Sequence, residues 1–545
     1  MAQLPSIDTK IETPVSQFDD ETINDVADVA LPKSDESSMV DNIRAKLKPL
    51  LLYVVSIAQF LDIVNGASVS VAILPIADNL KFNPPQVLWI VNSYTIAFAG
   101  LLLLSGRLGD LFGHRRLFLF GLFCFATWAL VVSFSSSPIM FVIARALQGA
   151  SAASTIPTAM ALISINYPAG PERTKAFSIF GVFGGMGAVA GLLISGGILA
   201  VAEWPWIFRI SSIASYLLLI LGFFSIPITP SKDERPKVDY IGATTSTLGV
   251  TSIVYYISAG VDYGWASPKT LPILFAGLLL IGAFIFAESR IQYPLMPLRL
   301  WKNRTFSISV ALAFISLAMA QGLIYNVNMV FQEVYGWTAI QTTLGFLVHA
   351  LLAAVVFGTL GRVLPRLPLK PLILVGFLLR SVASLMFALM NKHTSYWRIP
   401  FPALIVHILG IGVTFLPIQI IAVRDADNKD QGLVGAIYST GMHLGGPFGI
   451  AILNVIAVSI NTDTHGTLPR GPALMNGYQG AFFGAITLGL IGIVITLVFL
   501  PWDKPNRPPQ KLNQESQVIK DIEVGSAETI DVAKDITVND PKEEH

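Results

Sequence analysis

The sequence predicts an all-α integral membrane protein of about 14 transmembrane helices, arranged as two six-helix halves with two helices inserted between them. Of its 545 residues, 53% are hydrophobic and only 13% are charged, and the mean hydropathy is +0.63, which excludes an ordinary soluble enzyme. Apolar runs long enough to cross a bilayer recur along the chain. Spanning strands are excluded, because an open sheet would leave unpaired backbone groups facing lipid.

The expected spans are the apolar windows of helical length, and these lie at 49–74, 87–107, 116–136, 138–163, 177–201, 207–228, 238–260, 271–288, 306–331, 338–363, 370–390, 400–423, 431–458 and 478–500. We expect five regions along the chain: an acidic tail at 1–48, a six-helix half at 49–228, two inserted helices at 229–290, a second six-helix half at 291–500, and a second tail at 501–545.

The two tails are rich in acidic and hydroxyl residues, so we expect them to be disordered and exposed to water. No basic and then apolar leader precedes the acidic start, so no cleaved signal peptide is expected. The connections on the Arg115 side of the spans hold 17 lysines and arginines, against six on the opposite side. Basic residues concentrate on the cytosolic side of membrane proteins, so this side and both tails are predicted to be cytosolic.

The connection after the second span reads Gly106-Arg107-Leu108-Gly109-Asp110-Leu111-Phe112-Gly113-His114-Arg115-Arg116. Its charges are too costly for hydrocarbon, so they must lie at the interface or in a polar network. The pattern resembles the helix 2–3 loop signature of the major facilitator superfamily. We expect Gly106, Asp110, Gly113, Arg115 and Arg116 to form a cytoplasmic gate; a charged, solvated turn is the alternative. Gly358-x-Leu360-Gly361 echoes the motif after the tenth span, with Arg362 in the place of the acid.

Asp62 is the one acidic residue well inside a predicted span. An ionised carboxylate there costs several kcal/mol unless it is paired or hydrated, so Asp62 is a candidate proton-coupling residue. Gln59 and Asn65 lie three residues to either side on the same helix face and are candidates for the substrate cavity. A structural carboxylate that accepts helix hydrogen bonds is the alternative.

The fourth span contains Arg145 and Gln148 on one face of an apolar helix. Arginine does not lose its proton in proteins, so the guanidinium needs water, carbonyl groups or a carboxylate partner. Arg-x-x-Gln-Gly resembles the fourth-helix signature of proton-driven facilitators, in which the arginine is linked to proton coupling. We expect Arg145 to couple protons and Gln148 to line the cavity; a snorkelling or packing arginine is the alternative.

The ninth span offers Gln321, Tyr325, Asn328 and Gln332 on one continuous polar face, which predicts a cavity wall across from Asp62. A seam of hydrogen bonds between helices is the alternative. Three histidines also lie in predicted spans, at 349, 407 and 443. Of these we place His407 in the substrate cavity, because its span is the counterpart of that of Arg145; a satisfied structural histidine is the alternative.

Glycines at spacings of four recur in two spans, at Gly187 and Gly191 and again at Gly441 and Gly445, the latter followed by Gly446 and Pro447. Such spacing permits close helix packing. The first set resembles the antiporter signature of drug exporters, which usually has proline where this chain has Leu192. Simple tight packing is the alternative interpretation.

These motifs together resemble the fourteen-spanner drug:proton antiporter family, with Phe60–Asn65 and Trp89–Tyr94 closest to its fungal aminotriazole- and boron-resistance branch. The resemblance implies proton-coupled export of drugs, toxicants or small metabolites by alternating access, with Asp62 protonated from the outward-facing state. A carrier of a nutrient or small solute, such as ammonium, an amino acid, a siderophore or borate, is the alternative.

We expect no enzymatic activity, because the sequence shows no catalytic cluster, and no cofactor, since the proton gradient supplies the energy. The single Cys124 and the absence of His-x-x-x-His spacing predict neither a disulfide nor a metal site. The expected partners are the lipid bilayer, a small-molecule substrate and protons, with no nucleic acid, and the chain is expected to be a monomer. The plasma membrane is the predicted location, with the vacuolar membrane as the alternative.

Overall fold

The computed structural model describes residues 35–83, 86–167, 171–227, 239–291, 296–364, 367–424, 431–463 and 470–502. These residues form long α-helices and no strand, which confirms the predicted fold class. The helices are α2 (Asp35–Leu80), α3 (Trp89–Phe112), α4 (His114–Ser133), α5 (Pro138–Asn166), α6 (Pro171–Val201), α7 (Pro205–Ser225), α8 (Tyr240–Tyr263), α9 (Leu271–Arg290), α10 (Arg304–Met329), α11 (Ala339–Val363), α12 (Leu369–Ala388), α13 (Pro400–Arg424), α14 (Gln431–Asp463) and α15 (Arg470–Phe499). A 3₁₀ turn, η2 (Leu298–Lys302), precedes α10, and a π-helical turn, η3 (Val330–Val334), follows it.

Twelve of the described helices are long and apolar enough to cross a membrane, and α3, bent by 50° after Leu102, brings the number to 13. The helix outside this set is α8, whose threonines and serines lower its hydropathy. Several of these hydroxyls bond to carbonyls of their own helix, as Thr247 does to Ala243 at 2.8 Å. The predicted positions of the helices therefore hold, whereas length and composition support 12 or 13 spans rather than 14.

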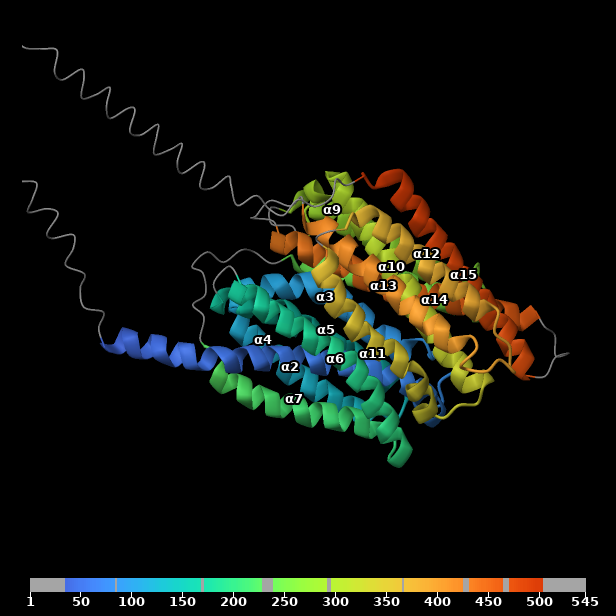
Figure 1. Cartoon of the computed structure of the whole chain (residues 1–545), viewed down its shortest axis with the longest axis horizontal. Helices are drawn as coiled ribbons and strands as arrows, with labels where there is room; N and C mark the ends of the chain where they lie inside the picture. The colour runs from blue at the N-terminus through green and yellow to red at the C-terminus, as the bar shows by residue number, and fades with distance from the viewer. Residues whose placement is uncertain are drawn as a thin grey trace, which may run out of the picture.

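The first helix differs from its prediction at both ends. α2 begins at Asp35, so residues 35–48, expected in the disordered tail, are helical and extend beyond the bundle (Figure 1). Its apolar part begins at Pro49, as predicted, and continues to Leu80 rather than ending at 74, because Pro75 is accommodated inside the helix. The rest of the predicted tails, residues 1–34 and 503–545, lies outside the described residues.

The packing of the helices repeats after an offset of eight. α2 packs on α6, α4 on α5 and α7, and α3 on α5; α10 packs on α14, α12 on α13 and α15, and α11 on α13. These two six-helix halves meet where α6 contacts α11 and α3 contacts α14, and Figure 1 shows α11 beside α6. The inserted helices α8 and α9 pack on each other, and α8 also contacts α3 and α14.

Glycines make the tightest crossing in the first half possible. A Cβ atom at Gly187 would lie 2.8 Å from the Phe60 carbonyl oxygen, and one at Gly191 would lie 2.7 Å from that of Val64. Real Cβ atoms do not approach this closely, so α6 can lie against α2 only with glycine at both positions.

The second half repeats this crossing with the same spacing. A Cβ atom at Gly445 would collide with the Phe314 carbonyl, and one at Gly449 with the Ala318 carbonyl. A Cβ atom at the neighbouring Gly446 would instead lie 3.4 Å from Gln321 Cγ, which is an ordinary contact. The two crossings align Phe60 with Phe314, so the halves can be compared residue by residue.

The two halves are joined at one end of the bundle, which we call the Trp204 side because Trp204 connects α6 and α7 there. Thr343 Oγ1 donates to the Leu192 carbonyl at 3.2 Å. Gln332 Nε2 donates to the Val71 carbonyl, also at 3.2 Å. The largest hydrophobic cluster is continuous across both halves here, with members such as Val69 and Phe331. The bundle is therefore sealed on the Trp204 side.

The opposite end, which we call the Gly113 side, is where α3 turns into α4. Four glycines on the interface helices lie towards this end, and a Cβ atom at any of them would find no atom within 4 Å: Gly106 on α3, Gly181 on α6, Gly358 on α11 and Gly435 on α14. A separate hydrophobic cluster, which includes Leu51 and Phe118, holds the first half together here. Among the described residues, these four positions on the Gly113 side therefore border open space.

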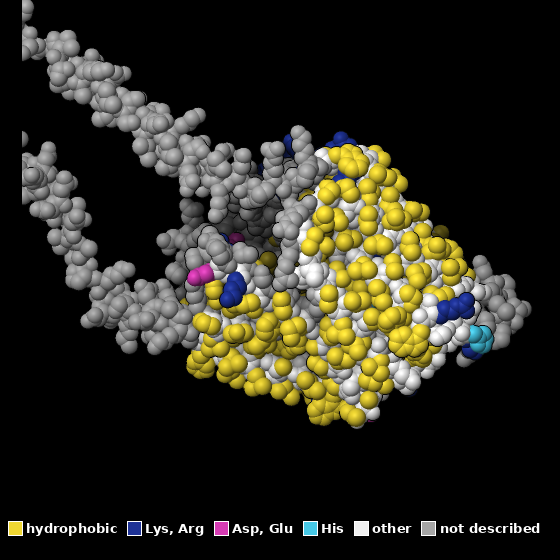
Figure 2. Space-filling view, in the orientation of Figure 1, with side chains coloured by type: hydrophobic (Ala, Val, Ile, Leu, Met, Phe, Trp, Pro, Cys, Tyr) yellow, Lys and Arg dark blue, Asp and Glu magenta, His cyan; other side chains and the backbone are white. Residues whose placement is uncertain are grey.

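The outer surface is suited to lipid. Large apolar side chains are exposed on many helices, including Phe224 at 74% and Leu279 at 73%. Figure 2 shows hydrophobic side chains over most of one face, with the few visible charged ones near the ends of the bundle. This distribution is what a bilayer requires, because charges are costly in its interior.

Candidate functional site

Asp62 lies on α2, half-buried in the first half of the bundle. The Tyr94 hydroxyl, on α3, donates a hydrogen bond to its Oδ1. One turn further along α2, a Cβ atom at Gly66 would meet nothing within 4 Å, so this face of α2 borders open space. The carboxylate is therefore held by one hydroxyl donor, one turn from open space at Gly66.

Arg145, on α5, is 1% exposed and lies beside this carboxylate. Its Nη1 donates to Asn65 Oδ1 at 2.5 Å and to Gln148 Oε1 at 2.8 Å. Its guanidinium carbon lies 4.4 Å from the centre of the Tyr94 ring, which is a cation–π contact. Tyr94 thus links the carboxylate and the guanidinium, because its hydroxyl hydrogen bonds to Asp62 and its ring contacts Arg145.

The backbone explains how these groups come together. A Cβ atom at Gly149, one turn after Arg145, would collide with the Tyr94 carbonyl, so the glycine lets α3 lie against α5. Asn65 is fixed from its other side, where its Nδ2 reaches the Ser211 hydroxyl on α7 at 3.5 Å. The structure brings together four predicted residues, Asp62, Asn65, Arg145 and Gln148, and adds Tyr94. The sequence offered only the Trp89–Tyr94 resemblance as a signal for the tyrosine.

Two of the predicted glutamines differ in their access to solvent. Gln59 is partly exposed one turn before Asp62, but its Oε1 is buried and has no hydrogen-bond partner. Gln321, on α10 of the second half, is exposed. In this structure the Gln321 side chain is therefore the more accessible of the two to a solute.

The polar face of α10 does not remain in the cavity along its whole length. Asn328 is 1% exposed and accepts from Gln332 Nε2 at 3.0 Å, and the same nitrogen donates to α2 in the seal. Tyr325 is 7% exposed. In this state Asn328 therefore belongs to the seal between the halves, and the expected face is split between cavity and seam.

His407 is placed differently from its prediction. It is 0% exposed, because this face of α13 turns towards α11 and α12 rather than towards the cavity. Its Nδ1 lies 3.2 Å from His349 Nε2 on α11, and the two rings are stacked with their centres 5.4 Å apart. His407 is thus not a cavity residue in this structure.

The predicted gate loop turns at Gly113, whose φ of 89° favours glycine. Asp110 is exposed and lies 3.5 Å from His114 Nε2. Arg115 donates to the Phe223 carbonyl on α7 at 2.7 Å, and Arg116 is exposed. In this open state the loop contacts its own half; the side chains of Arg107 and of Arg362 in the echo motif lie outside the described residues.

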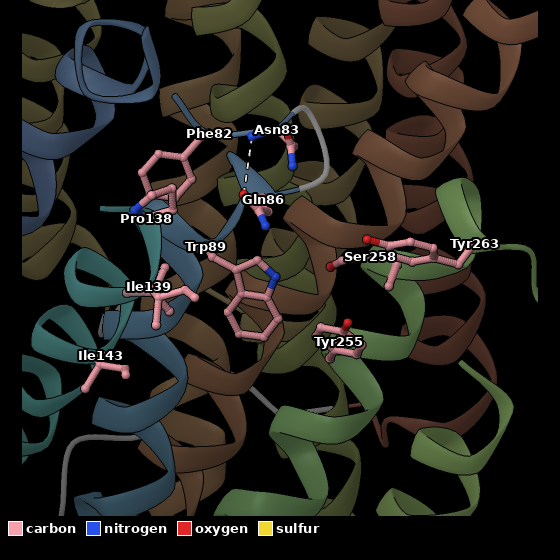
Figure 3. Close-up of a pocket in the computed structure, with 12 residues that line it drawn as sticks. Phe82, Asn83, Gln86, Trp89, Pro138, Ile139, Ile143, Tyr255, Ser258 and Tyr263 are labelled. Atoms are coloured by element: carbon pink, nitrogen blue, oxygen red, sulfur yellow. Dashed lines mark hydrogen bonds between the residues drawn. The ribbon is translucent and has the colours of Figure 1, made fainter. Parts of the chain in front are cut away.

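A lateral pocket of about 320 Å³ lies on the Trp204 side between α3, α5 and α8. Trp89, Ile139 and Tyr255 line it, with Gln86 and Ser258 as polar members (Figure 3). Ile139 is 70% exposed, so the pocket faces outwards from the bundle. None of the predicted site residues lines it.

The Major Facilitator Superfamily model matches residues 55–450 of the chain. The puromycin resistance protein pur8 of Streptomyces alboniger is 30% identical over 458 residues, which cover 83% of this chain and 90% of that protein. The low affinity ammonium transporter of Saccharomyces cerevisiae is 26% identical, over 80% of this chain and 85% of its own length. The efflux pump terJ of Aspergillus terreus is also 26% identical, over 82% of this chain and 87% of its own length.

Solved structures share the fold. The nucleoside transporter NupG, as a mutant, aligns with a TM-score of 0.60 over 84% of this chain and 100% of its own, at 12% identity. A peptide transporter of the POT type in complex with sulfate aligns with a TM-score of 0.59, at 14% identity, over 82% of this chain and 94% of its own. The family match covers most of the helical bundle, so the chain belongs to the Major Facilitator Superfamily and is a membrane transporter.

Proposed function

We propose that this transporter exports small molecules, of the drug, toxicant or small-metabolite class, in exchange for protons. The observation that carries the proposal is the network of Asp62, Tyr94 and Arg145. A carboxylate in a membrane protein interior costs several kcal/mol to keep, so its presence calls for a function. Reversible protonation is the chemistry that one carboxylate, one hydroxyl donor and one permanent cation provide together.

The network gives Asp62 two different sets of contacts. As a carboxylate it accepts from Tyr94 and is balanced by Arg145, whose charge is shared with Asn65 and Gln148. When Asp62 is protonated, its negative charge no longer compensates the positive charge of Arg145. The contacts of the network that connect α2, α3 and α5 then change in strength. A proton can therefore change the relative stability of the two transport states, provided that it binds one state more tightly.

The open and closed ends complete the cycle. By the distribution of basic residues we assign the Gly113 side to the cytosol, so this structure is the inward-open state. Substrate enters from the cytosol between the parted helices, and the seal at Leu192–Thr343 and Val71–Gln332 opens as the halves rock. Asp62 takes up a proton from outside and releases it inside.

Similarity to pur8 and terJ, named for puromycin resistance and efflux, supports export. The resemblance of the Gly187–Gly191 pattern to the antiporter signature of drug exporters supports it further. The yeast ammonium transporter is an equally long match and supports a second candidate, a carrier of ammonium or another small solute. Gln59 and Gln321 would contact either class in the cavity. We propose the plasma membrane as the location, with the vacuolar membrane as the alternative.

The test uses the purified full-length chain in liposomes with an imposed pH gradient, and follows labelled puromycin in one series and methylammonium in another. Proton coupling predicts gradient-driven accumulation of one of the two in the wild type and at least tenfold less with Asp62→Asn. Asp78→Asn is the matched control, because Asp78 lies on the same helix but is exposed at its outer end. Full gradient-driven accumulation by Asp62→Asn would show that Asp62 is not the proton site.

A further inference from the structure

The internal repeat allows the polar centre of the first half to be compared with its counterpart in the second. Arg145 is seven residues after Pro138, the first residue of α5, and His407 is seven residues after Pro400, the first residue of α13. Asp62 follows Phe60 by two residues at the α2–α6 crossing, and Ser316 follows Phe314 by two at the α10–α14 crossing. The second half therefore has His407 in the place of the arginine and Ser316 in the place of the acid.

This counterpart is also a polar network. His349 Nε2 and His407 Nδ1 are 3.2 Å apart, so one ring donates an N–H to the other. Arg380, on α12, donates to the Ser316 hydroxyl at 2.8 Å and to its carbonyl at 2.5 Å. Gly410, one turn after His407, lies against the Arg380 side chain, since a Cβ atom there would be 2.5 Å from its Cγ.

The surroundings of the imidazole pair define what can charge it. The groups that act electrostatically on His407 among the described residues are His349 on α11 and Arg380 on α12. The remaining neighbours of α13 are α10, which contributes the Ser316 hydroxyl through Arg380, and α14. Since arginine only donates hydrogen bonds, the buried and unpartnered Nε2 of His407 is most stable without a proton in this state. His407 Nδ1 then carries the proton and donates to His349.

The two rings differ in their access to the cavity. His407 is 0% exposed, whereas His349 is half-buried on α11, the helix that packs on α6 across the interface between the halves. Both lie towards the Trp204 side, which is sealed in this structure. Opening of the seal would expose His349 first, and His407 could exchange a proton only through it.

We propose that the His349–His407 pair is a second proton-binding site, which takes up a single proton when the Trp204 side opens. The inference rests on the proposed function, because only a proton-coupled cycle uses such a site. Two imidazolium rings both have only N–H donors and cannot hydrogen bond to each other, so the pair holds at most one additional proton while the contact persists. Arg380 is a positioning residue that keeps the pair neutral when the side is sealed.

The test counts protons on the purified full-length protein and needs no substrate. Every sample carries Thr343→Val, which removes a hydrogen bond of the seal and favours the state that is open on the Trp204 side. The protein is titrated from about pH 8 to about pH 5, the range in which histidine charge changes. Replacing both rings, as His349→Gln with His407→Gln, is expected to remove one bound proton relative to the same protein with both histidines.

A loss of no proton would mean that the pair is a structural hydrogen bond, and a loss of two would mean that the rings titrate independently; either result overturns the proposal. If the double variant does not fold, nitrogen NMR of the Thr343→Val protein with both rings, labelled at histidine, decides the question. One of the two rings should become doubly protonated while bonded to a neutral partner, and two permanently neutral rings would contradict the proposal. Transport measured with Asp62→Asn is separate, so a failure of the pair and a failure of proton coupling are distinguishable.

Discussion

At the scale of single residues, the site depends on Tyr94, which contacts both the Asp62 carboxylate and the Arg145 guanidinium. Asp62 and Arg145 do not form an ion pair within 4.0 Å among the described residues; Tyr94 connects them by a hydrogen bond and a ring contact. A tyrosine is unusual here because it can satisfy a carboxylate and a guanidinium at the same time. The coupling between the two charges should therefore be sensitive to that oxygen.

We expect Tyr94→Phe to reduce gradient-driven transport by about tenfold or more, because a hydrogen bond to a charged group contributes about 1.5–3 kcal/mol. Exchange of labelled for unlabelled substrate without a pH gradient should persist, since the ring and its contact with Arg145 remain. The measurement compares both assays in liposomes. Tyr216→Phe is the control. It removes a hydroxyl that lies away from the site and is 2.8 Å from Thr127 Oγ1, to which it hydrogen bonds. Equal loss in both assays would point to a general defect instead.

Sequence alone could identify the charged members of this site and not their contacts. Asp62 and Arg145 stand out because a charge in an apolar span is costly. Tyr94 does not stand out, since tyrosine is common in such helices. His407 was expected in the cavity because its span is the counterpart of that of Arg145. A repeat of spans does not show which neighbouring helix covers a residue, and the burial of His407 against His349 depends on tertiary packing.

At the scale of helices, α14 carries one glycine in close contact with α10, Gly449, and one that borders open space, Gly435. Gly449→Ala places a methyl group against the Ala318 carbonyl, so α10 must move away. Overpacking of this kind costs about 1–3 kcal/mol. Gly435→Ala faces open space and should be neutral or stabilising, since alanine is favoured over glycine in helices by about 0.5–1 kcal/mol.

The measurement is the thermal unfolding midpoint of the purified variants in detergent. Gly449→Ala should lower the midpoint and Gly435→Ala should not. A lower midpoint for Gly435→Ala would mean that α14 is tightly packed at Gly435. That result would contradict the open space found beside this residue.

The helices themselves could be predicted well, because each apolar run of spanning length is a helix in the structure. Their number in the membrane could not, since α8 is helical but less apolar than the rest. The apolar span of α2 begins at Pro49 as predicted, but the helix itself begins at Asp35. Hydropathy shows where lipid can contact a helix, and it does not show where the helix starts.

At the scale of the whole molecule, the sequence is compatible with both transport states, because the same helices form each of them. Which side is open depends on small differences between seal contacts, and these follow from three-dimensional packing. Among the described residues, the halves contact each other along α6–α11 and α3–α14, and hydrogen bonds cross between them at Leu192–Thr343 and Val71–Gln332. Small changes at the seal should therefore shift the balance between states without unfolding either half.

Thr343 gives the clearest test of this idea. Its hydroxyl donates to the Leu192 carbonyl at 3.2 Å across the two halves. A hydrogen bond of this type contributes about 1 kcal/mol, so Thr343→Val should shift the equilibrium about fivefold towards the state that is open on the Trp204 side. Thr359→Val is the matched control on the same helix, because its hydroxyl bonds to the Val355 carbonyl at 2.7 Å within α11.

The populations can be measured from the distance between spin labels at Gly106→Cys and Gly435→Cys in a chain whose only native cysteine, Cys124, is replaced by serine. Both positions border the open space on the Gly113 side, so labels there should not disturb packing. The short-distance population should grow with Thr343→Val and stay unchanged with Thr359→Val. If Thr343→Val leaves the distances as they are, this bond does not hold the seal. The balance would then depend on the continuous hydrophobic cluster around Val69 and Phe331.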